Sequence, residues 1–447
     1  MTALNFHDKL IKADCKEVNL KEEFVMTSRI PGFYNLPPEQ RLDKVAAILE
    51  LSDDEKARIK GEHGFTLKQA DRMIENAIGY LPVPLGVAVN FKVDGEDVFV
   101  PMATEEPSVV AAASHAAKLT YDTGGFTTSY TGSIMRGQIQ VTNLKAPYGA
   151  LARIYENKEE IIELCNKQDP TLVSFGGGAK DLDVHVIQGE TEKMIVVHLL
   201  IDTKDAMGAN AVNTMAEAVS PIIEKITEGK VVVRILSNLA DQRIVRARAV
   251  FENPFQGDQD VLKKFVSAHQ LANADPYRAA THNKGIMNGI SAVVLATGND
   301  TRAIEAGAHA YASISGQYRS LTQWELEGDQ TIIGTIELPL AVGLIGGATT
   351  SHPVAKLATK MLQVKTAERL AGIIASVGLA QNFAAIKALA SEGIQKGHMK
   401  LHARNMASMA GASDDQIDQV VKLAEKEQKF RFHDIEQFVQ SIQRRNL

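Results

Sequence analysis

The amino-acid sequence predicts an α+β fold, in which a small sheet-containing unit is inserted into a large, mainly helical one. Apolar residues recur at helical spacing through much of residues 1–131 and 241–393. Residues 132–240 instead follow the order strand, helix, strand, strand, helix, strand, which is typical of a split βαβ sandwich. Residues 394–447 are helical in character and dense in charge. We therefore expect a discontinuous large domain, an inserted domain and a C-terminal helical domain with these limits.

The first part of the large domain contains a helix, a hairpin and a second helix. Apolar spacing predicts a helix over 67–77, which the prolines at 82 and 84 terminate. Two β-rich runs around Asp94-Gly95 predict a hairpin over 87–100. An alanine-rich helix is expected over 109–119, because Pro107 suits a first helical turn. The Gly-, Ser- and Thr-rich segment 121–133 then predicts a joint between domains.

The remaining elements are predicted from apolar periodicity. In the inserted unit we expect strands at 138–142, 182–187, 194–202 and 231–235 and helices at 156–167 and 211–227. Beyond it we expect helices at 261–273, 285–297, 300–315, 353–376 and 379–392, with a strand at 331–338. Gly393 and Gly397 bracket a hinge before the charged tail.

The composition is that of an ordinary globular protein: 447 residues, 45% hydrophobic and 23% charged. A net charge of −6 argues against a dedicated nucleic-acid binder, which would carry a basic surface. Cys15 and Cys165 supply neither a disulfide framework nor a zinc cluster, which favours a reducing compartment. The apolar run 371–380 is short and interrupted by glycine, and the N-terminus lacks a signal-peptide pattern. We expect a cytoplasmic protein without a membrane partner.

The best candidate for phosphate binding is the segment Asp205-Ala-Met-Gly-Ala-Asn210, which follows a buried strand and opens a helix. A helix N-terminus presents free N–H groups to an anion, and Gly208 allows close approach. The alternative is an ordinary helix capped by Asp205. The sequence contains no glycine-rich dinucleotide fingerprint, phosphate loop, His-Glu-x-x-His pair or paired-cysteine motif, so we expect no metal.

Arg278, Lys284 and Asn288 lie close together at the start of an apolar helix. A cation at such a place can hold a carboxylate or stabilise an oxyanion, whereas the alternative is a solvated loop. Asp300 lies at the far end of the same helix and faces Lys284 only if the chain folds back.

Two further candidates stand beside helices. Glu105 and Glu106 precede the helix at 109–119, where the alternative role is to complement the helix dipole. His398 lies on the glycine-flanked hinge, which suits a residue carried by a lid.

Seven short strings occur in one order along the chain: Glu-Asn-Ala-Ile-Gly (75–79), Glu-Glu-Pro-Ser (105–108), Gly-Gly-Phe-Thr-Thr-Ser (124–129), Asp-Ala-Met-Gly-Ala-Asn (205–210), His-Asn-Lys-Gly-Ile-Met-Asn-Gly (282–289), Ala-Thr-Gly-Asn-Asp (296–300) and Gly-His-Met (397–399). Together they resemble the class II, bacterial-type 3-hydroxy-3-methylglutaryl-coenzyme A (HMG-CoA) reductases. The resemblance covers nearly all of residues 25–440 and does not include the membrane anchor of the eukaryotic class.

The resemblance implies a large HMG-CoA-binding domain around a central helix, an inserted ferredoxin-like, non-Rossmann NAD(P)-binding domain and a mobile C-terminal flap. It also implies an obligate homodimer, or a multiple of dimers, with active sites at the subunit interface. The activity implied is the four-electron interconversion of HMG-CoA and mevalonate plus coenzyme A with two NAD(P)H, through mevaldyl-CoA and mevaldehyde.

Site residues are also implied by the resemblance. The catalytic positions, with Glu106 rather than Glu75 as the glutamate, are Glu106, Lys284, Asp300 and His398. The positions that hold the acyl substrate are Ser108, Arg278, Asn288 and Gln381. The positions on the cofactor side are Asp169, Asp205, Met207, Gly208, Asn210 and Asn238.

The chemistry accounts for these residue types. Each hydride transfer leaves negative charge on oxygen, which the Lys284 cation can stabilise while Asp300 keeps it charged and oriented. Glu106 would act as an acid, which needs a pKa raised by burial. His398 can protonate the departing coenzyme A thiolate. Asp169 favours NADH, because a carboxylate accepts from a free 2′-hydroxyl and repels a 2′-phosphate, although Lys167 lies two residues earlier.

Two other functions remain as alternatives. One is a catalytically inactive homologue that still binds coenzyme A or a dinucleotide; replacement of a catalytic residue would favour it, and none is replaced. The other is a conventional Rossmann dehydrogenase, against which the missing glycine fingerprint argues.

Overall fold

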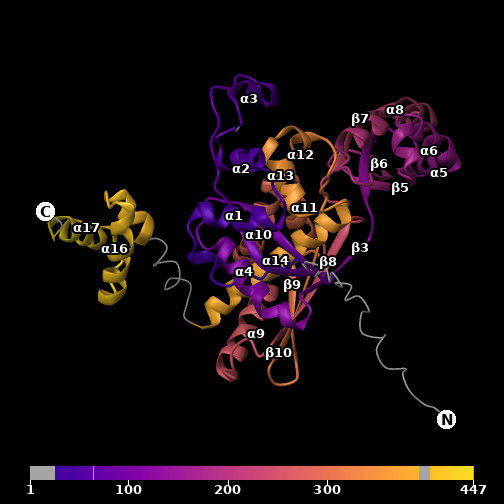
Figure 1. The fold of residues 1–447 in the computed structure, drawn as a ribbon. Coiled ribbons are helices and arrows are strands. Elements are labelled where there is room, and N and C mark those ends of the chain that lie inside the picture. The colour runs from indigo at the N-terminus through magenta and orange to yellow at the C-terminus, as the bar shows by residue number, and fades with distance from the viewer. Residues whose placement is uncertain (1–25, 64, 392–402, 446–447) are drawn as a thin grey trace, which may run out of the picture.

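The computed structural model describes residues 26–63, 65–391 and 403–445, and two separate sheets organise its α+β architecture (Figure 1). The predicted α+β class is confirmed. His398 and the hinge glycines Gly393 and Gly397 lie outside the described residues.

The first half of the large unit starts with short helices and then forms strands. The elements are η1 (Phe33–Asn35), α1 (Pro38–Ile48), α2 (Asp53–Lys60), α3 (Leu67–Met73), β1 (Leu85–Val93), β2 (Glu96–Ala103), α4 (Val109–Thr120), η2 (Tyr121–Thr123) and β3 (Phe126–Tyr130). The second half adds β8 (Ile244–Glu252), α9 (Gln259–Ala274), α10 (Pro276–Ala296), α11 (Thr301–Ala312), β9 (Thr322–Glu327), β10 (Thr331–Pro339), α12 (Gly347–Ser351), α13 (Pro353–Met361) and α14 (Ala367–Ala390).

These strands form one six-stranded sheet in the order β2-β1-β3-β8-β10-β9, antiparallel except where β1 meets β3. The sequence predicted the hairpin and β10 but neither β8 nor β9, and it treated the segment of β3 as a joint. Local composition hides β3, because Gly, Ser and Thr are typical of loops. Its neighbours β1 and β8, far away in the sequence, supply the partners that make it a strand.

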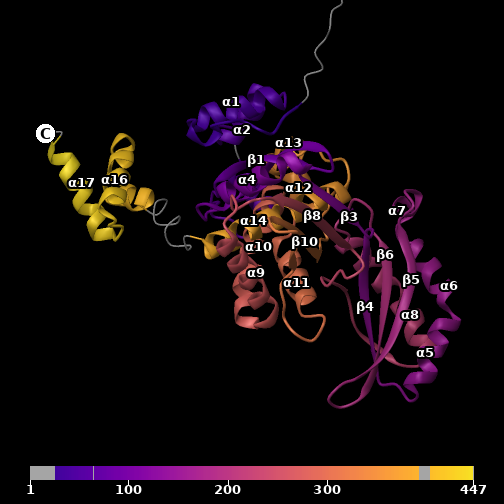
Figure 2. The same cartoon turned by 90° about the horizontal axis from the view of Figure 1, so that it is seen from below.

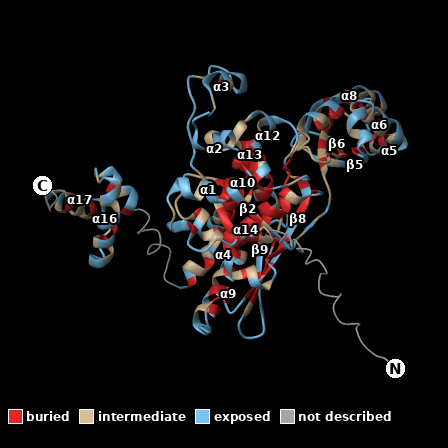
Figure 3. Ribbon diagram, in the orientation of Figure 1, coloured by how far each residue is buried: buried red, intermediate tan, exposed pale blue. Residues whose placement is uncertain are grey.

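Helix α14 occupies the centre of the large unit and packs against α4, α9, α10 and the sheet (Figure 3). It is the one helix among the described residues long and apolar enough to cross a membrane, and 72% of its most apolar window is buried inside the protein. It runs through both glycines of the 371–380 segment. A Cβ atom at Gly372 would come within 2.8 Å of Thr128, and one at Gly378 within 2.7 Å of Ile290. The glycines therefore permit close packing instead of ending the helix.

The predicted boundary between the last two helices of the large unit was wrong. We expected helices at 353–376 and 379–392, but the break falls between Met361 and Ala367. There Gln363 has a positive φ of 53°, and the Thr366 hydroxyl accepts a hydrogen bond from Arg369 N–H as the cap of α14. A capping side chain decides the start of a helix more strongly than a glycine inside it.

The inserted segment forms the second sheet, with strands β4 (Ile134–Thr142), β5 (Gly178–Gln188), β6 (Lys193–Asp202) and β7 (Lys230–Ser237) in the antiparallel order β5-β6-β4-β7. Helices α5 (Pro147–Glu156), α6 (Lys158–Asn166), α7 (Pro170–Ser174) and α8 (Ala209–Thr227) complete it. Figure 2 shows α5, α6 and α8 on one side of the sheet. This strand order is that of a ferredoxin-like split βαβ sandwich.

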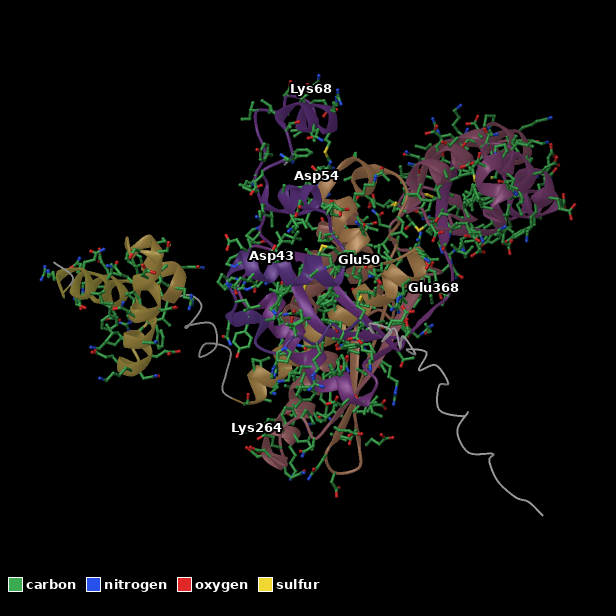
Figure 4. The ribbon with its side chains drawn as sticks, in the orientation of Figure 1. Asp43, Glu50, Asp54, Lys68, Lys264 and Glu368 are labelled. Atoms are coloured by element: carbon green, nitrogen blue, oxygen red, sulfur yellow. The ribbon has the colours of Figure 1, made fainter. Side chains whose placement is uncertain are left out.

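The described C-terminal residues form helices α16 (Asp414–Glu427) and α17 (Phe432–Arg445) around a small apolar core of their own. Charged side chains such as Asp43, Glu368 and Lys264 point outward from the helices of the large unit (Figure 4). Apolar burial is thus divided among one large cluster that spans both sheets, a second cluster beneath the N-terminal helices and this small C-terminal one.

Candidate active site

A polar group joins the β2–α4 connection to helix α10. Lys284 Nζ lies 2.8 Å from Glu106 Oε2, and Asn288 Nδ2 donates to Glu106 Oε1 at 3.2 Å. Lys284 and Asn288 are four residues apart on α10 and therefore share one face of the helix. The structure thus brings together three of the predicted site residues from segments almost two hundred positions apart.

Helix α10 begins earlier than predicted, and this places Arg278 and Lys284 on the helix. Asp275 accepts a hydrogen bond from Arg278 N–H at 2.9 Å, and Pro276 occupies the first turn. A carboxylate cap followed by proline is a favoured helix start. The alternative of a solvated loop is therefore wrong for these residues.

Ser108 stands at the start of α4 with a positive φ of 73°. Such a conformation is unfavourable for a residue with a Cβ atom and is concentrated at functional sites. The Ser108 hydroxyl makes no capping hydrogen bond, so it is not used to begin the helix.

The carboxylate of Glu106 is less buried than the sequence analysis expected. Its side chain is 35% exposed and that of Lys284 is 60% exposed, so both charges reach solvent in a single chain. An ion pair with this exposure contributes little to stability. A role of this ion pair in a reaction therefore explains its presence better than a role in stabilising the fold.

Gln381 lies on α14 beside this group and is 7% exposed. Its Oε1 atom is buried without a hydrogen-bond partner among the described residues. Its Cβ atom would lie 3.1 Å from a Cβ at Gly289, the residue after Asn288. A buried amide oxygen left unpaired costs about 1–3 kcal/mol, so a ligand that donates to it would relieve that cost.

Arg278 is the second group with unused hydrogen-bonding capacity. Its guanidinium has no ion-pair or hydrogen-bond partner in the described part of the chain, and burial lowers its pKa. It lies six residues before Lys284, on a different face of α10. A half-buried, unpaired guanidinium is suited to a carboxylate.

His282 holds α10 in place through hydrogen bonds to neighbouring elements. Its Nε2 atom lies within hydrogen-bond distance of Ser320, Thr322 and Asn382, at 2.7, 3.0 and 3.1 Å. Burial, with a smaller effect of the Arg278 charge, lowers the pKa of His282 to about 3. The imidazole is therefore neutral and ties α10 to α14 and β9.

Asp300 does not meet Lys284 within one chain. It caps α11, where it accepts from the N–H groups of Arg302 and Ala303 at 3.0 and 3.1 Å. Helix α10 continues to Ala296, so its end lies about 18 Å beyond Lys284 at 1.5 Å per residue. The chain does not fold back to close that distance.

The 205–210 turn opens α8, but Asp205 does not cap it. Gly208 is the N-cap, with φ 97°, and a Cβ atom there would lie 2.2 Å from Thr203. The Asp205 carboxylate instead accepts from Ala367 N–H at 2.7 Å, at the start of α14. Since no side chain caps α8, its first N–H groups remain available to an anion.

Arg243 supports this turn from beneath and was not singled out by the sequence analysis. It is 0% exposed, and its guanidinium donates to the backbone oxygens of Ala206, Met207 and Val342 at 3.0, 3.5 and 2.5 Å. Further bonds reach Tyr130 and Thr203. An arginine seldom signals this role in a sequence, because only the fold shows that it is buried.

The other cofactor-side residues lie at the edges of the small sheet. Asp169 accepts from Leu172 N–H at 2.8 Å and so caps the short helix α7. Lys167 pairs with Glu163 at 2.8 Å instead of approaching Asp169. Asn210 and Asn238 are exposed, at the start of α8 and after β7.

A cavity of about 910 Å³ lies between the N-terminal helices and α4. Its lining combines apolar side chains with the cations Arg29, Arg41, Lys60 and Lys118. Lys118 follows Ser108 by three helical turns of α4, which connects this cavity to the polar group along one helix. The sequence analysis missed the cavity because its lining comes from five separate segments.

Residues 37–403 match the family model described as Hydroxymethylglutaryl-coenzyme A reductase. The chain is 57% identical over 406 residues to the 3-hydroxy-3-methylglutaryl-coenzyme A reductase of Archaeoglobus fulgidus, covering 91% of this chain and 93% of that protein. The HMG-CoA reductase structure from Streptococcus pneumoniae is similar with a TM-score of 0.79 at 40% identity, covering 92% of this chain and 99% of that chain. A class II enzyme from the same organism, bound to NADPH in open conformations, has a TM-score of 0.78 at 41% identity, covering 81% and 99%.

Proposed function

Because the chain belongs to the hydroxymethylglutaryl-coenzyme A reductase family, we propose that Glu106, Lys284 and Asn288 form the reaction centre of an HMG-CoA reductase. The protein is an oxidoreductase that interconverts HMG-CoA and mevalonate plus coenzyme A. The contact that carries the assignment of the centre is the 2.8 Å pair between Lys284 and Glu106. The same pair argues against an inactive homologue, because its exposed charges contribute little to folding.

The proposed chemistry uses a cation, an acid and an orienting amide. A bound nicotinamide dinucleotide supplies the hydrides, two in succession for the four-electron change. Lys284 stabilises the charge that develops on the thioester oxygen and later on the aldehyde oxygen. Glu106, in its protonated form, gives a proton to the aldehyde oxygen when the second hydride reduces it to the alcohol, and Asn288 orients the carboxyl group. His398, outside the described residues, is proposed to protonate the coenzyme A thiolate when mevaldyl-CoA breaks down to mevaldehyde.

The groups with unused hydrogen-bonding capacity are proposed to hold the acyl substrate. The Arg278 guanidinium is suited to the free carboxylate of the hydroxymethylglutaryl group. The buried Oε1 of Gln381 would accept from the tertiary hydroxyl, and the free Ser108 hydroxyl completes the pocket. Each assignment uses a polar atom that has no partner among residues 26–63, 65–391 and 403–445.

The cationic cavity is proposed to take the nucleotide end of coenzyme A. Coenzyme A is long and carries several phosphate charges, which lysine and arginine neutralise. Burial and the neighbouring Lys387 and Lys118 lower the pKa of His115, so its imidazole stays neutral beside these cations. The course of α4 would then carry the ligand from the cavity to the reaction centre at Glu106.

The dinucleotide is proposed to bind at the 205–210 turn, with Asp205, Met207, Gly208 and Asn210 on the phosphate side and Asp169 and Asn238 at its margins. The uncapped N–H groups of α8 fit a pyrophosphate. We propose NADH as the preferred cofactor, because Asp169 would repel a 2′-phosphate and the nearby Lys167 is engaged with Glu163. A related structure from Streptococcus pneumoniae was solved with NADPH, so the preference needs a direct test.

We propose that the enzyme is a cytoplasmic homodimer, or a multiple of dimers, whose active site lies between subunits. Asp300 is separated from Lys284 of its own chain by the length of α10, so it would act on Lys284 of a second copy. Exposed apolar side chains support such a contact, since Ile78 is 98% and Leu81 88% exposed. The segments 1–131 and 241–393, 132–240 and 394–447 are proposed to act as substrate domain, cofactor domain and flap.

Mixing two inactive variants tests the reaction centre and the interface together. The Lys284→Ala and Asp300→Ala chains are coexpressed with different tags, and the dimers that carry both tags are purified. Each of these hybrid dimers should have one intact site, in which Lys284 of one chain meets Asp300 of the other. Random pairing makes half of the dimers hybrid, so the unselected mixture should regain about a quarter of wild-type HMG-CoA-dependent NADH oxidation. Each variant alone should be inactive.

The possible failures are distinguishable. Wild-type enzyme that oxidises no NADH in the presence of HMG-CoA would overturn the proposed activity. Active wild type with silent hybrids would leave the reductase in place and show that Asp300 serves its own subunit or none. Mevalonate formed at one molecule per two NADH confirms the four-electron stoichiometry in the same assay.

A further inference from the structure

Helices α5, α6 and α8 lie on one side of the small sheet and leave its other face open (Figure 2). That open face carries a cluster of ligand-type side chains. Strand residues alternate between faces: on β6, Val197 and Leu199 are buried while His198 between them is partly exposed. Asp183 pairs directly with His198 in the β5–β6 register, and His185 lies two positions further along the same strand. All three side chains therefore stand on the open face.

The side chains approach closely enough for one ion. One ligand atom from each of Asp183, His185 and His198 lies within 4.8 Å of the other two. His185 Nε2 is 2.9 Å from Asp183 Oδ2, and the two imidazole rings are 5.4 Å apart. Zinc bonds to nitrogen and carboxylate oxygen are about 2.0–2.2 Å long, which places tetrahedral ligands roughly 3.4 Å from one another. Small side-chain rotations on a rigid sheet would reach that spacing.

Neighbouring charges leave the cluster attractive to a cation. Arg136 Nη1 lies 4.0 Å from Asp183, but Arg136 is held by Asp241 in two bonds of 2.5 and 3.0 Å. The carboxylates of Asp183 and Asp241 and the guanidinium of Arg136 together carry a net charge of minus one. His185 and Asp183 are 50% and 41% exposed, so an ion can enter from solvent.

His198 supplies an unused ligand atom. Its Nε2 lies 2.9 Å from the side-chain amide of Gln138 on β4, the residue opposite it in the β4–β6 register. Its Nδ1 is shielded from solvent and has no hydrogen-bond partner in the described part of the chain.

We propose that Asp183, His185 and His198 bind one divalent transition-metal ion of the zinc type on the open face of the small sheet. Two imidazoles and one carboxylate suit zinc, cobalt or nickel better than magnesium or calcium, which prefer oxygen ligands. Three protein ligands leave a position for water. The ion would cross-link β5 to β6, and the proposal does not depend on the reductase assignment, whose hydride chemistry needs no metal.

Binding of Zn²⁺ to untagged full-length protein, measured by equilibrium dialysis, tests the proposal. Wild type is expected to hold one Zn²⁺ per chain, with at least tenfold weaker binding in His185→Gln. The matched control is His63→Gln, because His63 is also exposed and lies 3.3 Å from a carboxylate, Asp54, but belongs to no three-residue cluster of ligand-type side chains among the described residues. The control should bind Zn²⁺ as wild type does.

Thermal unfolding gives a second, independent measurement. An ion that binds only the folded state raises the unfolding temperature, so Zn²⁺ should raise it in wild type and in His63→Gln but not in His185→Gln. The proposal is overturned if His185→Gln binds Zn²⁺ as tightly as wild type, or if wild type binds none. Either result would show that the three side chains are only a hydrogen-bonded polar patch.

Discussion

The two halves of the candidate site are made of different parts of the chain. At the α10 end, side chains are proposed to carry the chemistry, and Glu106 contacts both Lys284 and Asn288 directly. At the 205–210 turn, backbone N–H groups are the proposed donors, and the side chains of Arg243 and Thr203 pack beneath the turn. The activity of the first half should depend on which functional groups are present. Ligand binding at the second half should depend on how rigidly the 205–210 turn is supported.

This difference predicts different responses to substitution. Removing a functional group at the α10 end removes a charge from the reaction, so the loss should fall on kcat. Loosening the turn changes the position of backbone N–H groups, so the loss should fall mainly on the KM for the dinucleotide. Four substitutions, from the largest expected effect to the smallest, test this contrast.

Lys284→Ala should lower kcat by about a thousandfold, because the loss of one group that stabilises a developing oxyanion costs 10²–10³ or more. Lys264→Ala is the matched control, since Lys264 is an exposed lysine on α9 that pairs with Asp260 (Figure 4). The measurement is the initial rate of HMG-CoA-dependent NADH oxidation. Turnover within tenfold of wild type would contradict the role of Lys284.

Arg243→Met should raise the KM for the dinucleotide by about tenfold with a smaller change in kcat, because the freed Ala206 and Met207 carbonyls no longer fix the turn. It should also lower the unfolding temperature. Arg243→Lys keeps the charge but loses the paired N–H donors of the guanidinium. Its KM for the dinucleotide and its unfolding temperature should therefore lie between those of wild type and Arg243→Met. A variant that is less stable but keeps the wild-type KM would show that Arg243 supports only the fold.

His282 links pH to the stability of the α10 end. Its folded-state pKa of about 3 lies below the ordinary 6.5, so the unfolded chain binds the proton more strongly. The stability that depends on neutral His282 is present above pH 6.5 and declines as pH falls toward 3. Between pH 7 and pH 5 wild type should lose about 2 kcal/mol more than His282→Gln does.

Urea unfolding of both proteins at each pH measures this difference. His269→Gln serves as a comparison, since His269 is also buried with a lowered pKa but lies on α9. Parallel pH profiles for wild type and His282→Gln would show that the imidazole is not the group responsible.

Asp169→Ala should change the ratio of kcat/KM for NADH to that for NADPH by about fivefold, since repulsion from one partly exposed carboxylate is worth up to ~1 kcal/mol. Wild type should favour NADH. An unchanged ratio in the variant would restrict Asp169 to its observed place at the start of α7. Wild type that favours NADPH would end the proposed preference.

Residue types and local order were accessible to sequence reasoning. The order of strands and helices in residues 132–240 follows from apolar periodicity, which is a local property. The 205–210 turn was found from its place between a strand and a helix. The sequence analysis missed that two helix starts compete for one side chain. It offered Asp205 as the cap of α8, but the Asp205 carboxylate accepts from Ala367 N–H at the start of α14.

By itself, the sequence determined the α+β class and the inserted unit, because ordered motifs and periodicity are written along the chain; the choice of Glu106 over Glu75 stays a prediction that the family resemblance implies. Only the tertiary structure placed Glu106 against Lys284, buried Arg243 beneath the 205–210 turn and set Asp183 opposite His198. These contacts join residues distant in sequence, and strand register and helix packing decide them by burying apolar faces together. No short window of sequence contains that information.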